Sequence, residues 1–308
     1  MVKQSSHRGL ALAAVATTVL TWGCSNVVAK LISTSGIVVS FYRLWFAIPV
    51  LWLIPAFVPS LRRRLTRDWV RASLVGGGLF SLHQLLFFSS LKRTSVANVS
   101  IIAALQPVLV LLVAGRMFGE RVTLRAALWS VLALIGTVIV VLGSTHAAHW
   151  SLQGDVLAVA NLFAFTAYFL ASKQVRADVG ALEYVIGMTT VSGLMILLAA
   201  LATGQHLLSP HGADWGYLLF LAMIPGTLGH LLTNWAHPHV SAFVISITLL
   251  GVPVFAAVGA ALFLQESLNA YHLAGGAVVL LAIAMIVLST SPATGEELAE
   301  SAAETGAP

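Results

Sequence analysis

Long apolar stretches separated by short polar segments dominate the pattern of this chain. A helix needs about 20 apolar residues to cross roughly 30 Å of hydrocarbon. The stretches that reach this length are residues 10–30, 37–58, 72–91, 95–115, 123–144, 152–172, 183–203, 215–235, 240–262 and 270–290. The pattern therefore predicts an all-α polytopic membrane protein with ten transmembrane helices.

Polar landmarks along these stretches recur at one fixed interval. Asp68-Trp69 returns as Asp214-Trp215, and 214 minus 68 is 146. The same interval relates Ser95 to Ser241, Ser100-Ile101 to Ser246-Ile247, Pro107-Val108 to Pro253-Val254, and Glu120 to Glu266. A constant offset of this kind indicates a duplicated unit. Because each unit holds five spans, an odd number, we expect two five-helix repeats that are inverted relative to each other.

The repeat divides the chain into four parts. Residues 1–8 form a short N-terminal segment, residues 9–144 the first repeat and residues 152–290 the second. Residues 291–308 place four glutamates among small residues, which is typical of a disordered acidic tail.

Composition and charge placement support a membrane protein and indicate its orientation. Apolar residues make up 58% of the chain and charged residues 9%, whereas soluble domains carry roughly 25% charged residues. With the N-terminus inside, 12 of the 16 lysines and arginines lie on the cytoplasmic side and 3 outside, with Arg43 inside a span. This basic bias predicts cytoplasmic termini, and we expect the bacterial inner membrane as the location. It also accounts for the net charge of +5 without a nucleic-acid partner.

A set of individual residues in each repeat forms a pattern that extends over about residues 9–290. In the first repeat these residues are Trp22-Gly23, Ser25-Asn26, Arg43, the run from Ser95 through Pro107-Val108 to Gly119-Glu120, Gly136 and Gly143. Those in the second repeat are Tyr168, Pro253-Val254, Gln265-Glu266 and Gly275-Gly276. In these residues the chain resembles the EamA-type transporters of the drug/metabolite transporter superfamily. The resemblance implies a central cavity between the repeats, alternating access, and export of amino acids, related metabolites or xenobiotics.

Polar side chains in the middle of spans are the candidates for a substrate cavity, because an unpartnered polar group in hydrocarbon costs free energy. His83 and Gln84 lie midway along the third span, and Gln84 is equivalent to His230 in the eighth. The remaining candidates are Trp22 and Asn26, Asn98 and Gln106 on one helical stripe, Tyr168, and Asn234 one turn beyond His230. Their chemistry suits a small zwitterionic or neutral solute. The alternative is that they only bond between helices.

A second group of residues is predicted to be structural. Pro107 and Pro253 interrupt the backbone ladder within their spans. Glu120 and Glu266 lie at span ends, where a carboxylate can cap backbone N–H groups. Arg43 is expected to reach the membrane surface or pair with Glu266, ahead of the alternative that it meets a carboxylate on the cargo.

The sequence thus predicts a secondary transporter, and the resemblance implies that it exports small metabolites, with amino acids or related compounds as the expected cargo. A drug or xenobiotic efflux carrier is the alternative, and a non-transport membrane protein or intramembrane enzyme is the alternative from another class. A zinc-hydrolase H-E-x-x-H motif and a P-loop are both missing, so no catalytic residue, metal or cofactor is expected. The expected partners are a small-molecule substrate and the lipid bilayer, and a homodimer is left open.

Overall fold

The computed structural model describes residues 2–62, 66–120, 122–143, 151–263, 265 and 268–289, and all regular secondary structure within them is helical. The elements of the first repeat are α1 (Val2–Leu31), α2 (Gly36–Trp45), α3 (Ala47–Phe57), α4 (Pro59–Arg62), α5 (Arg67–Leu91), α6 (Val96–Ala103), α7 (Gln106–Phe118) and α8 (Leu124–Gly143). Those of the second are α9 (Leu152–Val175), α10 (Ala181–Ala202), α11 (Asp214–Leu221), the π-helix η2 (Ala222–Gly229), α12 (His230–Ala236), α13 (Ala242–Thr248), the 3₁₀-helix η3 (Leu249–Gly251), α14 (Val252–Phe263) and α15 (Ala270–Ser289).

These elements form ten helices that are long and apolar enough to cross a membrane. They cover residues 7–31, 36–57, 67–91, 96–118, 124–143, 152–175, 181–202, 214–236, 242–262 and 270–289. The predicted spans are confirmed. The largest difference is at the start of the third, which begins at residue 67 rather than 72 because its first turn is polar.

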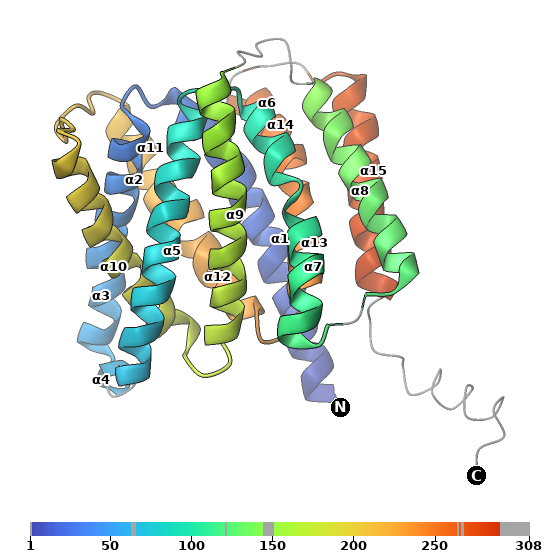
Figure 1. Cartoon of the computed structure of the whole chain (residues 1–308), viewed down its shortest axis with the longest axis horizontal. Helices are drawn as coiled ribbons and strands as arrows, with labels where there is room; N and C mark the ends of the chain where they lie inside the picture. Colours follow the sequence, from blue (N-terminus) through green and yellow to red (C-terminus); the bar gives the residue numbers. More distant parts are fainter. Residues whose placement is uncertain are drawn as a thin grey trace.

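The ten spans form two inverted five-helix repeats. The chain crosses the bundle ten times, so α1 begins and α15 ends on the same face, which we call the N-terminal face (Figure 1). Packing follows the repeat. α1 packs along α14, and its counterpart α9 packs along α6 and α7. Likewise, α5 of the first repeat packs against α9 and α10 of the second. The corresponding eighth span packs against the first repeat: α12 and η2 contact α1, and η2 also contacts α2.

Prolines interrupt four of the spans. The second span is divided between α2 and α3 at Phe46, shortly before Pro49. The fourth and ninth are divided just before Pro107 and Pro253, which occupy equivalent positions in the two repeats. The eighth contains Pro225 inside η2. A proline lacks a backbone N–H, so each one leaves a carbonyl four residues earlier without its usual helical donor.

Two lysines outside the expected basic face donate to backbone carbonyls instead. Lys92, on the face opposite the N-terminal face, donates from Nζ to the carbonyls of Ala29 (2.8 Å) and Ile32, at the C-terminal end of α1. Lys30 donates to the carbonyl of Thr94 at 2.7 Å. Burial, together with the nearby charge of Lys30, lowers the pKa of Lys92 to about 8. These lysines therefore satisfy orphan carbonyls, which explains their departure from the basic bias.

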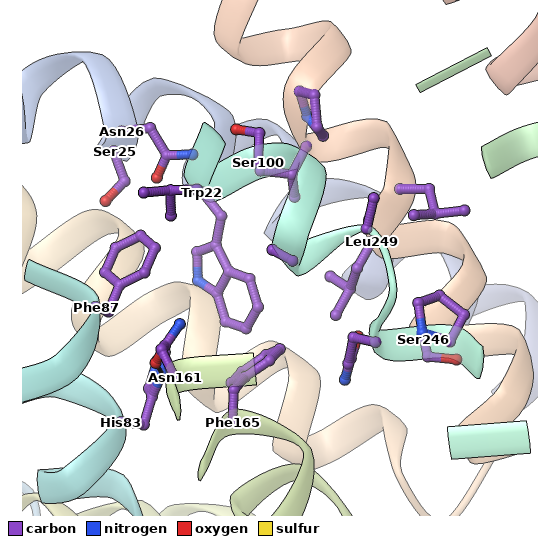
Figure 2. A pocket seen from close by; sticks show the side chains of 18 of the residues that line it. Trp22, Ser25, Asn26, His83, Phe87, Ser100, Asn161, Phe165, Ser246 and Leu249 are labelled. Carbon is purple, nitrogen blue, oxygen red and sulfur yellow. Dashed lines mark hydrogen bonds between the residues drawn. The ribbon is translucent and has the colours of Figure 1, made fainter. Parts of the chain in front are cut away.

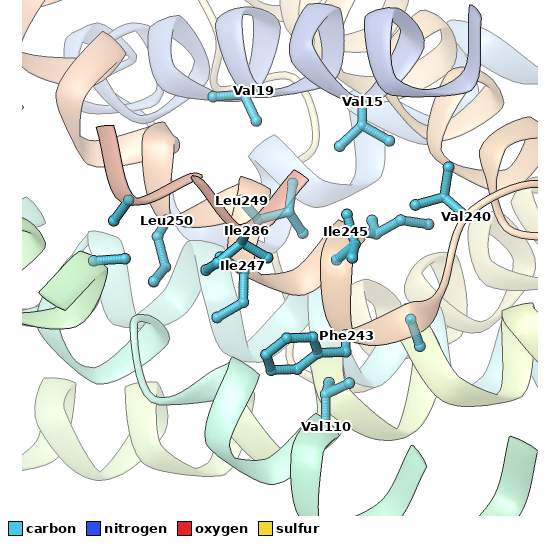
Figure 3. Packing of buried hydrophobic residues seen from close by; sticks show 14 of the residues in the cluster. Val15, Val19, Val110, Val240, Phe243, Ile245, Ile247, Leu249, Leu250 and Ile286 are labelled. Atoms are coloured by element: carbon cyan, nitrogen blue, oxygen red, sulfur yellow. The ribbon is translucent and has the colours of Figure 1, made fainter. Parts of the chain in front are cut away.

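The ninth span forms the centre of the apolar core. Buried residues make up 83% of its most apolar stretch, against at most 56% in the other spans. Figure 3 shows Phe243, Ile245 and Ile247 packed between Val15 and Val19 on one side and Val110 on the other. The helix that carries one of the proline breaks is thus held on all sides by its neighbours.

Small residues allow the last span of each repeat to pair closely. α8 and α15 pack along each other at one side of the bundle (Figure 1). A Cβ atom added at Gly275 would lie 2.7 Å from the Gly136 carbonyl oxygen and 2.7 Å from the Val140 nitrogen. The helix backbones approach so closely that only glycine fits at the crossing.

We predict that Gly275→Ala lowers the thermal stability of the purified protein in detergent. The added methyl group meets backbone atoms that cannot rotate away, and overpacking of this kind costs roughly 1–3 kcal/mol. Gly216→Ala in α11 is the matched control, because no atom lies within 4 Å of the new Cβ there. Thermal unfolding followed by tryptophan fluorescence measures the difference. Equal melting temperatures for the two variants would contradict the close crossing.

Candidate functional site

An internal cavity of about 120 Å³ lies at the seam between the two repeats. Seven of the ten spans line it; the fifth, seventh and tenth do not. The lining residues are Trp22, Ser25, Asn26, Arg43, His83, Phe87, Val99, Ser100, Ala103, Ala104, Gln106, Pro107, Asn161, Phe165, His230, Ser246, Leu249, Leu250, Val252 and Pro253. Figure 2 shows the Trp22 ring among them, with Phe87, Asn161 and Phe165 nearby.

The cavity is built around the repeat symmetry. The fourth and ninth spans contribute pairs of lining residues that are 146 positions apart: Ser100 and Ser246, Ala103 and Leu249, Ala104 and Leu250, Gln106 and Val252, Pro107 and Pro253. Both helix breaks therefore lie at the cavity. Because Pro107 and Pro253 cannot donate, the carbonyls of Ala103 and Leu249 lose their ordinary helical partners beside this space.

The π-helix in the eighth span positions two of the cavity side chains. Pro225 cannot donate to the Leu221 carbonyl four residues earlier, and the chain continues there as a π-helix. Nε of Arg43 also donates to the Leu221 carbonyl, at 3.3 Å. Nε1 of Trp22 donates to the Pro225 carbonyl at 3.1 Å. Two side chains of the first repeat are thus held by backbone oxygens of the second repeat, at a break in its helix.

Arg43 lies inside the bundle and has only neutral partners. Its side chain is 4% exposed, so it does not reach the surface. One terminal nitrogen donates to Oε1 of Gln84, and the other lies 3.3 Å from Nε2 of His230. The guanidinium also lies 5.3 Å from the centre of the Phe88 ring. Among the residues that the structure describes, no carboxylate lies within ion-pair distance of this cation.

The contact with Arg43 determines the protonation form of His230. Arginine only donates hydrogen bonds, so Nε2 of His230 must accept and carries no proton. The proton then sits on Nδ1, which lies 3.3 Å from the hydroxyl of Tyr168. That hydroxyl also accepts from Nδ2 of Asn234 at 3.3 Å. A chain of hydrogen bonds thus runs from Gln84 through Arg43, His230 and Tyr168 to Asn234, and Arg43 is its one charged member.

Aromatic rings and amides form the rest of the wall. The Trp22 ring lies 4.9 Å from that of His230 and 6.0 Å from that of Phe165, measured between centroids. His83 lies 4.7 Å from Phe165 and bonds through Nδ1 to Oδ1 of Asn161 at 2.7 Å. These contacts give one side of the cavity flat apolar surfaces with hydrogen-bonding edges.

Among the described residues that line the cavity, Gln106 stands apart because its amide nitrogen has no partner. The residue is 3% exposed, and Nε2 is buried without a hydrogen bond. It occupies the first turn of α7, directly before Pro107, and both residues line the cavity. A buried donor without an acceptor is costly, so the cavity wall contains one unsatisfied amide donor.

The structure brings most of the predicted site residues together. Trp22, Asn26, His83, Gln106 and His230 line the cavity, whereas Gln84, Tyr168 and Asn234 lie behind them and hold Arg43 and His230. The prediction did not include Ser25, Phe87, Ser100, Asn161, Phe165 and Ser246, which also line it. Asn161 had a signal in the sequence, as an isolated amide in the middle of the sixth span. The aromatic residues had none, because phenylalanine is common in any span.

Asn98 does not lie at the cavity. Its amide nitrogen donates to Thr94 Oγ1 at 3.2 Å and to Oδ1 of Asp155 at 3.1 Å, near the start of α6. The predicted stripe from Asn98 to Gln106 assumed a continuous helix. The break at the end of α6 interrupts that stripe, so that Val99, Ser100 and Ala103 face the cavity instead.

Glu120 closes the bundle at the N-terminal face. Its carboxylate accepts from the backbone N–H groups of Ala242 (2.7 Å) and Phe243 (3.1 Å) and lies 3.2 Å from Nζ of Lys173. Glu120 therefore caps a helix, as predicted, but the helix is α13 of the other repeat. Its equivalent Glu266 lies outside the residues that the structure describes.

The same region contains a buried histidine outside the spans. Lys173 also donates to the carbonyls of His237 (3.1 Å) and Val240 (2.9 Å). Burial, with the positive charges of Lys173 and Arg176 nearby, lowers the pKa of His237 to about 3. His237 is neutral at physiological pH and does not add to the positive charge. Across the described chain, no group of three potential metal ligands comes together.

Comparison with known proteins shows two matches to one family and several similar exporters. The model of the EamA-like transporter family matches residues 9–142 and 152–288. The pseudopaline exporter CntI of Pseudomonas aeruginosa is 28% identical over 225 residues, which are 73% of this chain and 77% of that protein. The "probable terminal-alkyne amino-acid exporter" of Streptantibioticus cattleyicolor is 27% identical over 74% of this chain and 76% of its own.

Two further likenesses are weaker in sequence. The aromatic amino acid exporter YddG of Ancylobacter novellus is 27% identical over 52% of this chain and 54% of that protein. One solved crystal structure superimposes with a TM-score of 0.77 at 17% identity and covers 93% of this chain and 100% of its own. The latter likeness shows a shared fold.

We predict that Glu120→Gln destabilises the protein, because the amide cannot accept from both N–H groups of α13 and leaves Lys173 without its carboxylate. Loss of such charge-assisted bonds costs roughly 1–3 kcal/mol. Asp178→Asn, at an exposed position beyond α9, makes the same chemical change as a control. Melting temperatures in detergent compare the two, and an unchanged value for Glu120→Gln would contradict this role.

Proposed function

The chain belongs to the EamA-like transporter family, and on this basis we propose that it exports small metabolites of the amino-acid class across a bacterial inner membrane by alternating access. The observation that carries the proposal is the symmetric cavity at the seam of the repeats. A solute held there contacts both halves of the protein, so rocking of one half against the other would expose it to each side in turn.

The proline breaks support this mode of action. Three of the four interrupted spans, the fourth, eighth and ninth, place their interruption at the cavity wall or directly behind it. Unwound backbone is tolerated at membrane depth only where protein or a water-filled cavity satisfies it. Breaks of this kind also let the two halves of a helix tilt separately, which is what a rocking movement requires.

The size and walls of the cavity favour an amino acid over a larger drug. A cavity of about 150 Å³ holds one benzene molecule, so a cavity of 120 Å³ has room for a solute of roughly that size. Drug-sized ligands occupy pockets of roughly 300–1,000 Å³, so this space suits a small solute on the order of an amino acid. Aromatic rings, amides and one cation can contact its apolar, polar and anionic parts. Two of the similar proteins are named as amino-acid exporters, in agreement with this size.

The proposed orientation places the N-terminal face in the cytoplasm. Arg67 and Arg71 lie in the first turns of α5, which begins at this face (Figure 1), and the equivalent loop of the second repeat, residues 206–217, has no lysine or arginine. Basic loops remain in the cytoplasm during insertion. We therefore propose cytoplasmic termini for the mature protein.

Blocking the cavity should stop transport without unfolding the protein. We predict that Ala103→Trp reduces efflux at least tenfold, because the indole fills the space that a solute needs. Ala274→Trp, exposed on α15 and away from the cavity, is the control and should transport normally. The assay uses proteoliposomes loaded with a mixture of the twenty common L-amino acids, with efflux measured by mass spectrometry. Undiminished efflux by a folded Ala103→Trp protein would contradict the proposed route.

The orientation is tested by cysteine labelling. Cys24 is the only cysteine in the sequence, so Cys24→Ser provides a clean background. We predict that Ser209→Cys reacts with a membrane-impermeant maleimide in intact cells, whereas Ser60→Cys reacts only after permeabilisation. The reason is that these two loops are equivalent in the repeats and emerge on opposite faces. Labelling of both positions in intact cells would rule out the inverted arrangement.

A further inference from the structure

Among the residues that the structure describes, no carboxylate balances the positive charge of Arg43. Its partners are an amide oxygen, a backbone carbonyl and a neutral imidazole. A buried charge normally has an ion partner, since removing it from water is costly. Arg43 also lines the cavity, and the residues lining the cavity in the described structure include no aspartate or glutamate. The charge therefore faces a space in which an anion would be stabilised.

The guanidinium still has donors to offer. Arginine carries five N–H groups, and its three contacts occupy one on each nitrogen. One N–H on each terminal nitrogen remains for another acceptor. A carboxylate has two oxygens and commonly accepts two such bonds side by side from one arginine. The neutral partners hold the group in place without competing for this charge.

We propose that Arg43 anchors a carboxylate of the cargo, which makes this carrier selective for small solutes that bear one carboxylate. The inference rests on the proposed transport function and deepens it. The aromatic wall formed by Trp22, Phe87 and Phe165 receives the rest of the solute. Arg43 is the only lysine or arginine at the described cavity, so a solute with several negative charges would leave some of them unpaired.

Gln106 provides an independent second donor. Its Nε2 is buried and has no partner, and the residue lines the same cavity from the fourth span. The residue belongs to the first turn of α7, a helix of 13 residues whose positive end therefore lies at the cavity. An amide donor and a helix N-terminus both favour an anionic or carbonyl oxygen. The field within the cavity thus has the sign that attracts a carboxylate.

The distinguishing variant is Gln84→Glu. Oε1 of Gln84 already accepts from Arg43, so the substitution puts a carboxylate of the same shape beside the guanidinium and neutralises it from within. This variant should be at least as thermally stable as the wild type and should lose affinity for carboxylate solutes at least tenfold. Gln174→Glu, exposed near the end of α9, adds the same charge away from the cavity and should bind normally.

Binding is measured by thermal shift on the purified full-length protein at low ionic strength. The probes are three pairs that differ in the carboxylate alone: acetate and acetamide, benzoate and benzamide, and L-phenylalanine and L-phenylalaninamide. We expect the carboxylate members to stabilise the wild type and the amides to have little effect. Arg43→Lys keeps the positive charge but loses the paired N–H donors of the guanidinium. Its affinity for the carboxylates should therefore lie between those of the wild type and Gln84→Glu.

The outcomes separate this inference from the proposed function. Equal stabilisation by amides and carboxylates, or wild-type affinity in Gln84→Glu, would overturn the role of Arg43 even if proteoliposomes export amino acids. Lack of stabilisation by any carboxylate would overturn it as well. Carboxylate binding that disappears in Gln84→Glu, in a protein that moves no amino acid, would support the anchor and contradict the transport proposal.

Discussion

The structure depends on one constraint: within hydrocarbon, backbone polar groups must find partners inside the protein. Pro225 cannot give the Leu221 carbonyl its α-helical hydrogen bond, and Arg43 donates to that oxygen from the second span. Trp22 donates to the carbonyl of Pro225 itself. These two bonds tie the first repeat to the second and hold a cation and an indole at the cavity. The π-helix around Pro225 therefore positions Arg43 and Trp22 at the cavity, and these two side chains in turn supply hydrogen-bond donors to its carbonyls.

Equivalent residues of the two repeats form much of the cavity wall, and two positions at which the repeats differ make the cavity asymmetric. Five pairs of equivalent residues on the fourth and ninth spans line it, and the equivalent Gln84 and His230 both contact Arg43. Arg43 itself has Thr189 as its counterpart, since 43 plus 146 is 189, and Pro225 has Leu79. The first repeat thus supplies the buried cation, Arg43, and the second repeat supplies Pro225 with its π-helix. An asymmetric solute can be oriented in this way by a nearly symmetric scaffold.

Charges are used differently at the edge of the bundle and in its middle. At the N-terminal face, Glu120 and Lys173 pair with each other and with helix ends, so their charges are balanced locally. At the cavity, the partners of Arg43 are neutral and its charge is left for a ligand. The ion pair at the edge holds helix ends of the two repeats together, because both of its partners are largely buried there. An unbalanced cation in the middle instead favours states in which an anion is bound beside it.

The sequence by itself determined the ten spans, the repeat and its inversion. The spans follow from the length of apolar stretch that crosses the bilayer, and the repeat and its inversion follow from the constant spacing of polar residues and the placement of basic residues along the chain. The same reasoning found Trp22, His83, Gln106 and His230, since an isolated polar residue within a span is costly unless it has a function. Only the tertiary structure decided which of these side chains meet. It moved Asn98 to the side of Asp155, brought Arg43 between Gln84 and His230 instead of to the surface, and added Asn161 and Phe165 to the wall. The physical reason is that helix breaks and crossings between segments far apart in the chain set the direction of a side chain, and a linear pattern does not contain them.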